Sequence, residues 1–298
     1  MKKIINLLTS GFLFLGLAHG LDDYSNYRSK PQKHKNKRNK NSQGNSNSNP
    51  SGKVVGGLDV GIEYYRYQEP GVMKISGPMM TFYGDVGYVK SFFKIQADGY
   101  FSTSLGANHY DGALQNNQTR AVTPYTADSK DWYGAINGKV GVTLFPQNKQ
   151  FVFAYVGLGY RFLHNNVVSD YAYGRDQGYL YIPIGVMGEI PVKSTFSILG
   201  AVEYRFLIIG NNVSGFKKLG YDNNLHFVQR GGSGGRLSVG GKFYLSNGGA
   251  VRVKLYYDFW QIDHSNVVAA KKGGQVQGFF VEPKNNTMVL GASIGYVF

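Results

Sequence analysis

The chain contains no cysteine, and this absence excludes a disulfide framework and any metal site built on thiolates. Beyond its first 20 residues it has no apolar run of 18 or more residues, which excludes a helical membrane protein. Acidic residues are scarce, with 18 aspartates and glutamates against 32 lysines and arginines, and the formal net charge is +14. A strongly basic balance can indicate an anionic partner, so its distribution along the chain matters.

The residue types that are abundant favour strands. The chain has 23 tyrosines, 19 phenylalanines and 41 glycines, and 42% of its residues are hydrophobic. Aromatic residues are strand formers, and glycine lets strands bend or approach one another closely. We therefore expect an all-β fold, in which alternation of apolar and polar residues takes the place of long apolar segments.

The first 20 residues have the three parts of a secretory signal peptide. Lys2 and Lys3 form the charged part, residues 4–17 form the apolar part, and Ala18-His19-Gly20 forms a cleavage site of the small-x-small type. The apolar part is too short to span a membrane. We expect residues 1–20 to direct export and to be removed.

Residues 21–53 differ in composition from the rest of the chain. They hold eight lysines and arginines against two aspartates, and residues 41–52 are only Asn, Ser, Gly, Gln and Pro. Such a segment buries too little apolar surface to offset its ordering entropy, so we predict a disordered basic periplasmic tail and linker. The tail binds an anionic cell-wall polymer, lies against the barrel as a mobile plug that would gate a channel, or serves as a spacer. It lacks the interleaved aromatic residues of single-stranded nucleic-acid binders, and we expect no nucleic-acid partner.

From residue 54 onward, alternating segments have the length of tilted transmembrane strands. The predicted strands are 54–68, 79–90, 93–107, 131–145, 151–163, 178–190, 194–209, 235–246, 250–263 and 287–298. Four connections are short, at Ser91, 146–149, 191–193 and 247–249, and five are long, at about 69–78, 108–130, 164–177, 210–234 and 264–286. Alternating short turns and long loops indicate a transmembrane antiparallel up-and-down β-barrel over 54–298. We predict about ten strands, with eight or twelve as alternatives.

The last strand has one apolar face. Its outward set is Leu290, Ala292, Ile294, Tyr296 and Phe298. A terminal phenylalanine after an alternating strand resembles the C-terminal signature of Gram-negative outer-membrane β-barrel proteins. The resemblance implies an outer-membrane location, contact with lipid and lipopolysaccharide, and an assembly signal at Tyr296 and Phe298 for the barrel assembly machinery. The Tyr-Asn-Lys-rich composition is similar to that of small outer-membrane proteins of the Helicobacter and Campylobacter kind.

The charged residues of the strands are expected to face the lumen, because a charge facing lipid near the midplane costs about 2–4 kcal/mol. The predicted lumen residues are Asp59, Glu63, Asp85, Lys94, Asp98, Lys139, Arg161, Glu203, Arg205, Arg236, Lys242, Arg252, Lys254 and Asp258. The first three strands are rich in acids and the eighth and ninth in bases, which predicts one acidic wall and a basic wall opposite. This arrangement fits either a salt-bridged filling or a narrow water path.

Aromatic residues near the predicted strand ends are expected to anchor the barrel at the two membrane interfaces. These girdle residues are Tyr64, Tyr65, Tyr67, Trp132, Tyr133, Tyr204, Phe206, Trp260 and Phe298.

Three functions are compatible with such a barrel. The first is a non-enzymatic surface protein, since long loops rich in Asn, Gly, Tyr and Ser suit surface contacts or adhesion. The second is a narrow porin-like channel between the charged walls. The third is a rim hydrolase, because ten strands resemble the omptin proteases, whose family carries acidic and Asp/His pairs at the extracellular mouth.

The rim candidates for such chemistry are pairs of titratable residues: His109 with Asp111, Asp128 with Asp131, His164 with Asp170, His226 with Asp222, and Asp263 with His264. None lies in a motif that matches the omptins or the lipid A deacylases. We therefore expect no enzymatic activity, no catalytic residues, no cofactor and no metal.

Overall fold

The computed structural model describes residues 52–115, 121–144 and 151–298. The predicted signal peptide lies outside these ranges, as does the predicted tail apart from Gly52 and Lys53. The first strand begins at Lys53, one residue inside the predicted tail.

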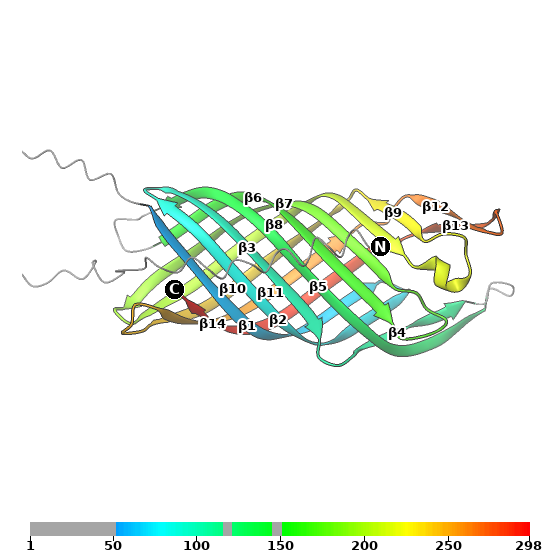
Figure 1. Cartoon of the computed structure of the whole chain (residues 1–298), viewed down its shortest axis with the longest axis horizontal. Helices are drawn as coiled ribbons and strands as arrows, with labels where there is room; N and C mark the ends of the chain where they lie inside the picture. The colour runs from blue at the N-terminus through cyan, green and yellow to red at the C-terminus, as the bar shows by residue number, and fades with distance from the viewer. Residues whose placement is uncertain (1–51, 116–120, 145–150) are drawn as a thin grey trace, which may run out of the picture. The chain divides into compact units, whose positions relative to one another are not determined.

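The described residues form a closed antiparallel barrel of ten strands, as the alternation predicts (Figure 1). The strands are β1 (Lys53–Glu69), β2 (Met73–Lys90), β3 (Phe93–Ser104), β5 (Val122–Leu144), β6 (Phe151–Val167), β7 (Arg175–Lys193), β8 (Phe196–Ser214), β10 (Gly232–Tyr244), β11 (Ala250–Ile262) and β14 (Asn285–Val297). Each pairs with its neighbours in chain order, and β1 pairs with both β2 and β14. Every strand of the closed barrel therefore has two partners, and none is left as a free edge.

Most of the strands, β3 and β11 excepted, extend further than predicted at the end of the barrel where the long connections lie, here called the loop end. The predicted long connection 69–78 is wrong, because β1 ends at Glu69 and β2 begins at Met73. Only residues 70–72 connect them. At the opposite end, here called the turn end, β7 continues to Lys193, so the turn lies at residues 194–195 rather than 191–193.

Three of the other four long connections carry ordered elements, the exception being the one between β6 and β7. They contain β4 (Asn108–Gln115), the 3-10 helix η3 (Phe216–Leu219), β9 (Leu225–Gln229), β12 (Val267–Lys272) and β13 (Gln275–Val281). Figure 1 shows the four strands at the end of the barrel away from the C-terminus. We call these five elements the loop-end crown. No helix within the described ranges is long and apolar enough to cross a membrane.

The outer surface of the barrel is apolar along its middle. On β1 the outward side chains are Leu58, Val60, Ile62 and Tyr64, all exposed, and on β14 they include Leu290, Ile294, Tyr296 and Phe298. Because side chains alternate between faces, the same strands direct their charges inward. Beyond Tyr64 the outward positions of β1 are Arg66 and Gln68, so the apolar belt ends before Glu69.

Four of the predicted girdle aromatics are not in the girdle. Tyr65, Tyr67, Tyr133 and Trp260 are almost fully buried inside the barrel. Each lies at an inward position of its strand, where alternation and not proximity to the strand end decides the direction of the side chain. Tyr64, Tyr204, Phe206 and Phe298 are exposed on the outer face, as predicted, and Trp132 packs there against Phe162 and His164.

Candidate functional site

The structure places the predicted lumen residues on the inner face of the barrel. Ten are buried: Asp59, Glu63, Lys94, Asp98, Lys139, Arg161, Glu203, Arg205, Arg252 and Asp258. Four are partly exposed and each forms an ion pair: Asp85, Arg236, Lys242 and Lys254. The interior is therefore a polar network. The alternation of apolar and polar residues along the strands is the sequence feature that indicates which residues belong to it.

At the turn end, one arginine joins three strands. The Nε of Arg252 on β11 donates to Asp59 on β1 at 2.6 Å, and one of its two terminal nitrogens, Nη2, donates to Asp85 on β2. Lys254 contacts the second oxygen of Asp59. Further toward the turns, Lys242 pairs with Glu189 at 3.0 Å, and Lys94 lies 4.5 Å from the ring centre of Phe153.

These contacts correct the prediction of opposed acidic and basic walls. The basic strand β11 is separated from the acidic strand β1 by β14 alone, because the barrel closes through the β1–β14 pairing. The acidic and basic sets therefore meet side by side and neutralise each other. No pair of separated walls remains to set up a field across the lumen.

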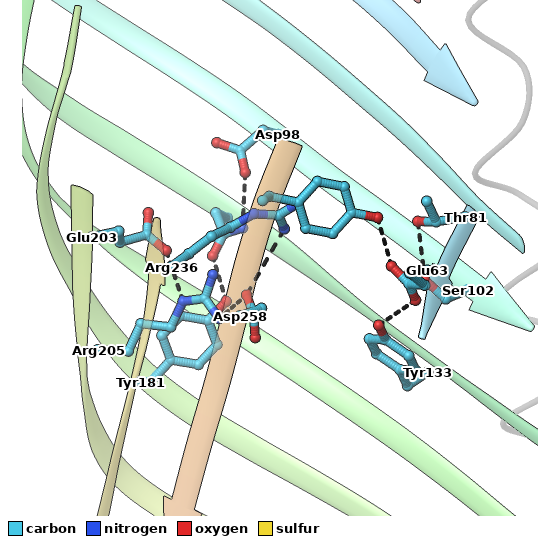
Figure 2. Close-up of polar contacts among 12 residues, drawn as sticks. Glu63, Thr81, Asp98, Ser102, Tyr133, Tyr181, Glu203, Arg205, Arg236 and Asp258 are labelled. Carbon is cyan, nitrogen blue, oxygen red and sulfur yellow. Dashed lines mark hydrogen bonds and ion pairs between the residues drawn. The ribbon is translucent and has the colours of Figure 1, made fainter. Parts of the chain in front are cut away.

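The middle of the lumen is crossed by a chain of ion pairs. Lys139 on β5 contacts Asp98 on β3 at 2.8 Å and Glu203 on β8 at 2.9 Å. Arg205 then links Glu203, at 2.7 Å, to Asp258 on β11, at 2.8 Å (Figure 2). Because β5 and β8 are separated in the sheet by β6 and β7, these side chains span the interior rather than one wall.

A buried carboxylate also links distant strands through phenols. Tyr256 donates to Glu63 at 2.6 Å, and Tyr133 donates to the other carboxylate oxygen. Figure 2 shows this group beside the hydrogen bond from Ser102 to Thr81. The phenols belong to strands β11 and β5, on either side of β1 in the closed barrel. Glu63 is thus held from two sides of the lumen.

Arg161 on β6 has a different environment from the other buried cations. Its guanidinium carbon lies 5.3 Å from the ring centre of Tyr133, 5.7 Å from that of Tyr179 and 5.9 Å from that of Trp260. Its side chain is fully buried, and none of its three nitrogens has a hydrogen-bond partner in the part of the chain that the structure describes.

At the loop end, three charged residues that the sequence did not single out form a further cluster. Arg175 pairs with the buried Glu69 and lies 3.6 Å from Glu282. Burial raises the pKa of Glu69, and Glu282 adds to this while Arg175 opposes it. Glu69 and Arg175 lie at strand ends, and Glu282 directly follows β13, where the predicted loops gave no facing pattern. The cluster closes the lumen above the apolar belt.

Some space remains among the interior side chains. A cavity of about 70 Å³ within the network is lined by Tyr100, Arg205 and Lys254, among others. A second, of about 170 Å³, lies at the loop end beside Asn165 and Arg175. Both are small compared with the 300–1,000 Å³ of sites that hold drug-sized ligands.

The structure pairs some of the rim residues considered for hydrolysis differently from the sequence-based prediction. His164 contacts Asp176 at 2.6 Å instead of Asp170, and its ring stacks on the outward-facing Trp132. Asp131 is buried and accepts hydrogen bonds from Asn108, Ser129 and Asn165. The remaining rim residues are exposed: His109, Asp111, Asp128, Asp170, Asp222, His226, Asp263 and His264. Within the described residues, no group of acidic residues and histidines is placed to hold a metal.

The β12–β13 hairpin of the crown has two apolar faces. Its inner face places Ala270 and Phe280 against Phe216, Leu225 and Phe227. Its outer face carries Val267, Val276, Phe279 and Val281, which are 63%, 50%, 75% and 45% exposed. Val267 and Val281 are directly paired across the two strands.

Local contacts fix the position of this hairpin. Gly273 and Gly274 form its turn with φ values of 61° and 77°, a left-handed conformation that glycine adopts without strain. The carboxylate of Asp222 accepts hydrogen bonds from the backbone N–H groups of both glycines, at 2.8 and 2.9 Å. The backbone of Asp222 also donates to Lys271 at 2.9 Å. The exposed apolar face therefore belongs to an ordered element.

Comparison with known proteins identifies the fold without a family. No family model matches the sequence, and no curated protein matches it. Among solved structures, the outer-membrane protease OmpT from Escherichia coli superposes with a TM-score of 0.59, at 10% identity over 82% of this chain and 96% of that one. Neisserial surface protein A gives a TM-score of 0.31 at 8% identity, covering 82% of this chain and 97% of that one. Together with the apolar belt, the closed barrel gives this protein the fold and location of a Gram-negative outer-membrane β-barrel.

Proposed function

We propose that the protein is a non-enzymatic outer-membrane surface protein that binds another surface through its loop-end crown. The observation that carries the proposal is the exposed apolar face of the β12–β13 hairpin. Phe279 at its centre is 75% exposed, and it lies on an element that follows the end of β11 at Ile262, past the apolar belt. Lipid does not cover this face.

An ordered apolar face in water favours a binding role. Contiguous exposed apolar patches are rare on soluble surfaces and mark sites of interaction. The hairpin that carries the patch also has exposed lysines, Lys271 and Lys272, at the end of β12. The combination suits a partner surface that is both amphipathic and negatively charged, such as a glycolipid-rich cell surface.

The barrel interior supports this role over transport. The ion pairs from Lys139 to Asp258 and the phenols on Glu63 occupy the middle of the lumen. The Glu69–Arg175–Glu282 cluster occupies its loop end. The interior therefore acts as a rigid core that supports the crown, and the exposed rim histidines have no arrangement that would activate a nucleophile.

Other partners follow from the outer face. Tyr296 and Phe298 point outward on the last strand, where the barrel assembly machinery would recognise them, and lipopolysaccharide would surround the belt on the loop side. The basic tail would act on the periplasmic side, as a ligand for cell-wall polymer or as a spacer. The resemblance in composition to small Helicobacter and Campylobacter outer-membrane proteins is part of the same proposal.

The test compares attachment of bacteria that express the wild-type protein, Phe279→Ser or Tyr171→Ser to cultured epithelial cells. Tyr171 is the matched control, because it is an equally exposed aromatic residue at 71% but lies outside the hairpin. We expect Phe279→Ser to lower attachment severalfold and Tyr171→Ser to leave it unchanged, with equal surface display. The proposal would be overturned if bacteria with the wild-type protein attach no better than bacteria that lack it. Equal attachment of the wild type and both variants would also overturn it.

A further inference from the structure

We propose that Arg161 forms the centre of a buried binding site for a small monovalent anion of the halide class inside the barrel. The site is independent of the crown and of the surface role proposed above. It rests on the partners of the buried arginines and on the atoms that surround Arg161.

Arg161 lacks the counterion that the comparable arginines have. Arg205 contacts Glu203 and Asp258, Arg252 contacts Asp59 and Asp85, and Arg175 contacts Glu69 and Glu282. Arg161 is 1% exposed, as is Arg205, yet it has no ion pair with any residue that the structure describes. A buried charge without a partner is strongly destabilising, which indicates that another species supplies the negative charge.

The carboxylates in this region are already occupied. Asp258 is held by Arg205 and lies 3.9 Å from Arg236. Asp131 accepts hydrogen bonds from three neutral side chains. Neither contacts Arg161.

The groups around Arg161 are donors rather than acceptors. The indole of Trp260 packs against the guanidinium, and its Nε1–H has no partner among the described residues. The ring centre of Tyr100 lies 5.9 Å from that of Tyr133, which itself packs on the guanidinium, and the Tyr100 hydroxyl is also buried without a partner among the described residues. Aromatic faces contact the guanidinium through its π surface, and this leaves its in-plane N–H groups unsatisfied. Unsatisfied N–H and O–H groups around one cation are the coordination that an anion requires.

The available space limits the size of the ligand. Arg161 and Trp260 line neither of the two cavities described above, whereas Tyr100 lines the one of about 70 Å³. The space beside the guanidinium is therefore far below that of a drug-sized ligand site, which limits the ligand to a small ion. Chloride and its heavier analogues fit both the size and the donor set.

The experiment uses the refolded full-length barrel carrying Trp132→Phe, which leaves Trp260 as the single tryptophan of the two in the chain. Sodium iodide is titrated at constant ionic strength with gluconate as the replacement anion, and Trp260 fluorescence is recorded. We expect saturable quenching that chloride reverses by competition. In Arg161→Met the quenching should become linear, with at least a tenfold loss of affinity, while Arg230→Met, a change of an exposed arginine, should match the parent.

Two further measurements keep the test decisive if Arg161→Met fails to fold. Tyr100→Phe removes one donor and should weaken iodide binding severalfold. The unmodified barrel should unfold at a higher temperature in chloride than in gluconate at equal ionic strength, because a ligand bound only to the native state stabilises it. Linear quenching in the parent together with equal unfolding temperatures in the two salts would overturn the proposal and assign the unsatisfied donors to water.

Discussion

The guanidinium of Arg252 donates to the carboxylate of Asp59 at 2.6 Å, although the two residues are 193 positions apart in the chain. The pair joins β11 to β1 across β14, next to the place where the barrel closes. It therefore ties the late strands to the first one from inside the lumen, independently of the backbone ladder.

This pair predicts an asymmetric effect of mutation. Asp59→Asn or Arg252→Met alone should destabilise the barrel by about 3 kcal/mol, because the first leaves Lys254 and the second leaves Asp85 without its ion-pair partner inside the barrel. The double variant should lose less than the sum of the two. Urea unfolding of the refolded barrel in detergent measures both, with the exposed Lys90→Met as the control. Additive losses would show that Asp59 and Arg252 act separately.

The outer belt predicts a difference between two positions on the outer face of one strand, one inside the belt and one beyond it. Ile62 is 66% exposed on the outer face of β1. Ile62→Lys should destabilise the barrel in lipid bilayers by about 2–4 kcal/mol, because it places a charge in hydrocarbon. Arg66→Lys, on the same face but above the belt, should have little effect. The readout is the folded fraction in vesicles. Equal folded fractions for the two variants would place Ile62 outside the hydrocarbon region.

A glycine at the closing pair of strands predicts a folding defect. A side-chain carbon at Gly295 on β14 would overlap the carbonyl oxygen of Leu58 and the carboxylate of Asp59 on β1. Gly295→Ala should therefore weaken closure and lower the yield of heat-modifiable, folded barrel. Gly138→Ala is the matched control, since a side-chain carbon there meets no atom within 4 Å. Normal closure of Gly295→Ala would contradict this prediction, because it would show that β1 and β14 accommodate the added methyl group without losing their pairing.

The loop-end cluster predicts a dependence of stability on pH. Burial, reinforced by Glu282, raises the pKa of Glu69 above its usual value of 4.5. The protonated form is thus favoured in the folded state, and this contribution is fully present below pH 4.5 and is lost as the pH rises through the raised pKa. Glu69→Gln keeps the neutral form at every pH.

The corresponding measurement is the urea midpoint of wild-type and Glu69→Gln barrels between pH 4.5 and pH 8. The stability of Glu69→Gln relative to wild type should increase with pH over this window. Asp170→Asn, which alters an exposed carboxylate at the same end, should give no such trend. A pH-independent difference for Glu69→Gln would contradict the assigned burial effect.

The filled interior predicts the electrical behaviour of the barrel. The refolded protein should show no discrete conductance steps in a planar bilayer, with or without residues 21–53, because the Lys139, Glu203 and Arg205 chain crosses the lumen. Replacement of Arg205 and Glu203 by alanine removes two links and serves as the positive comparison. Steps from the wild-type protein that change on removal of the tail would favour the gated-channel alternative.

The sequence predicts the barrel because one property, alternation, is both local and physically required. Arg252, Lys254 and Asp258 alternate with Val253 and Leu255, and lipid excludes the charged set from one face. Tyr65 and Trp260 were assigned to the outer face because they lie near strand ends. The alternation rule itself places both on the inner face, where the structure has them. The start of β2 was missed because Gly77-Pro78 indicates a loop, although both residues lie within the strand.

The crown and the interior pairings could not be predicted in this way. Phe216, Phe227 and Phe280 meet in one cluster although Phe280 lies in a different connection from the other two, and no local pattern encodes that contact. The Glu69–Arg175 pair likewise depends on the shear of the closed barrel, which a single sequence does not reveal. Alternation gives the face of each side chain but not its partner.

The pairing of β1 with both β2 and β14 also sets an order of events. Gly57 is directly opposite Val297, so the first strand of the barrel gains its second neighbour from the last residues of the chain. Until β14 docks, β1 keeps one edge of unpaired amide and carbonyl groups that no lipid can satisfy. Insertion and closure must therefore be nearly simultaneous. A barrel in the membrane whose β14 has not yet paired with β1 would be open between these two strands.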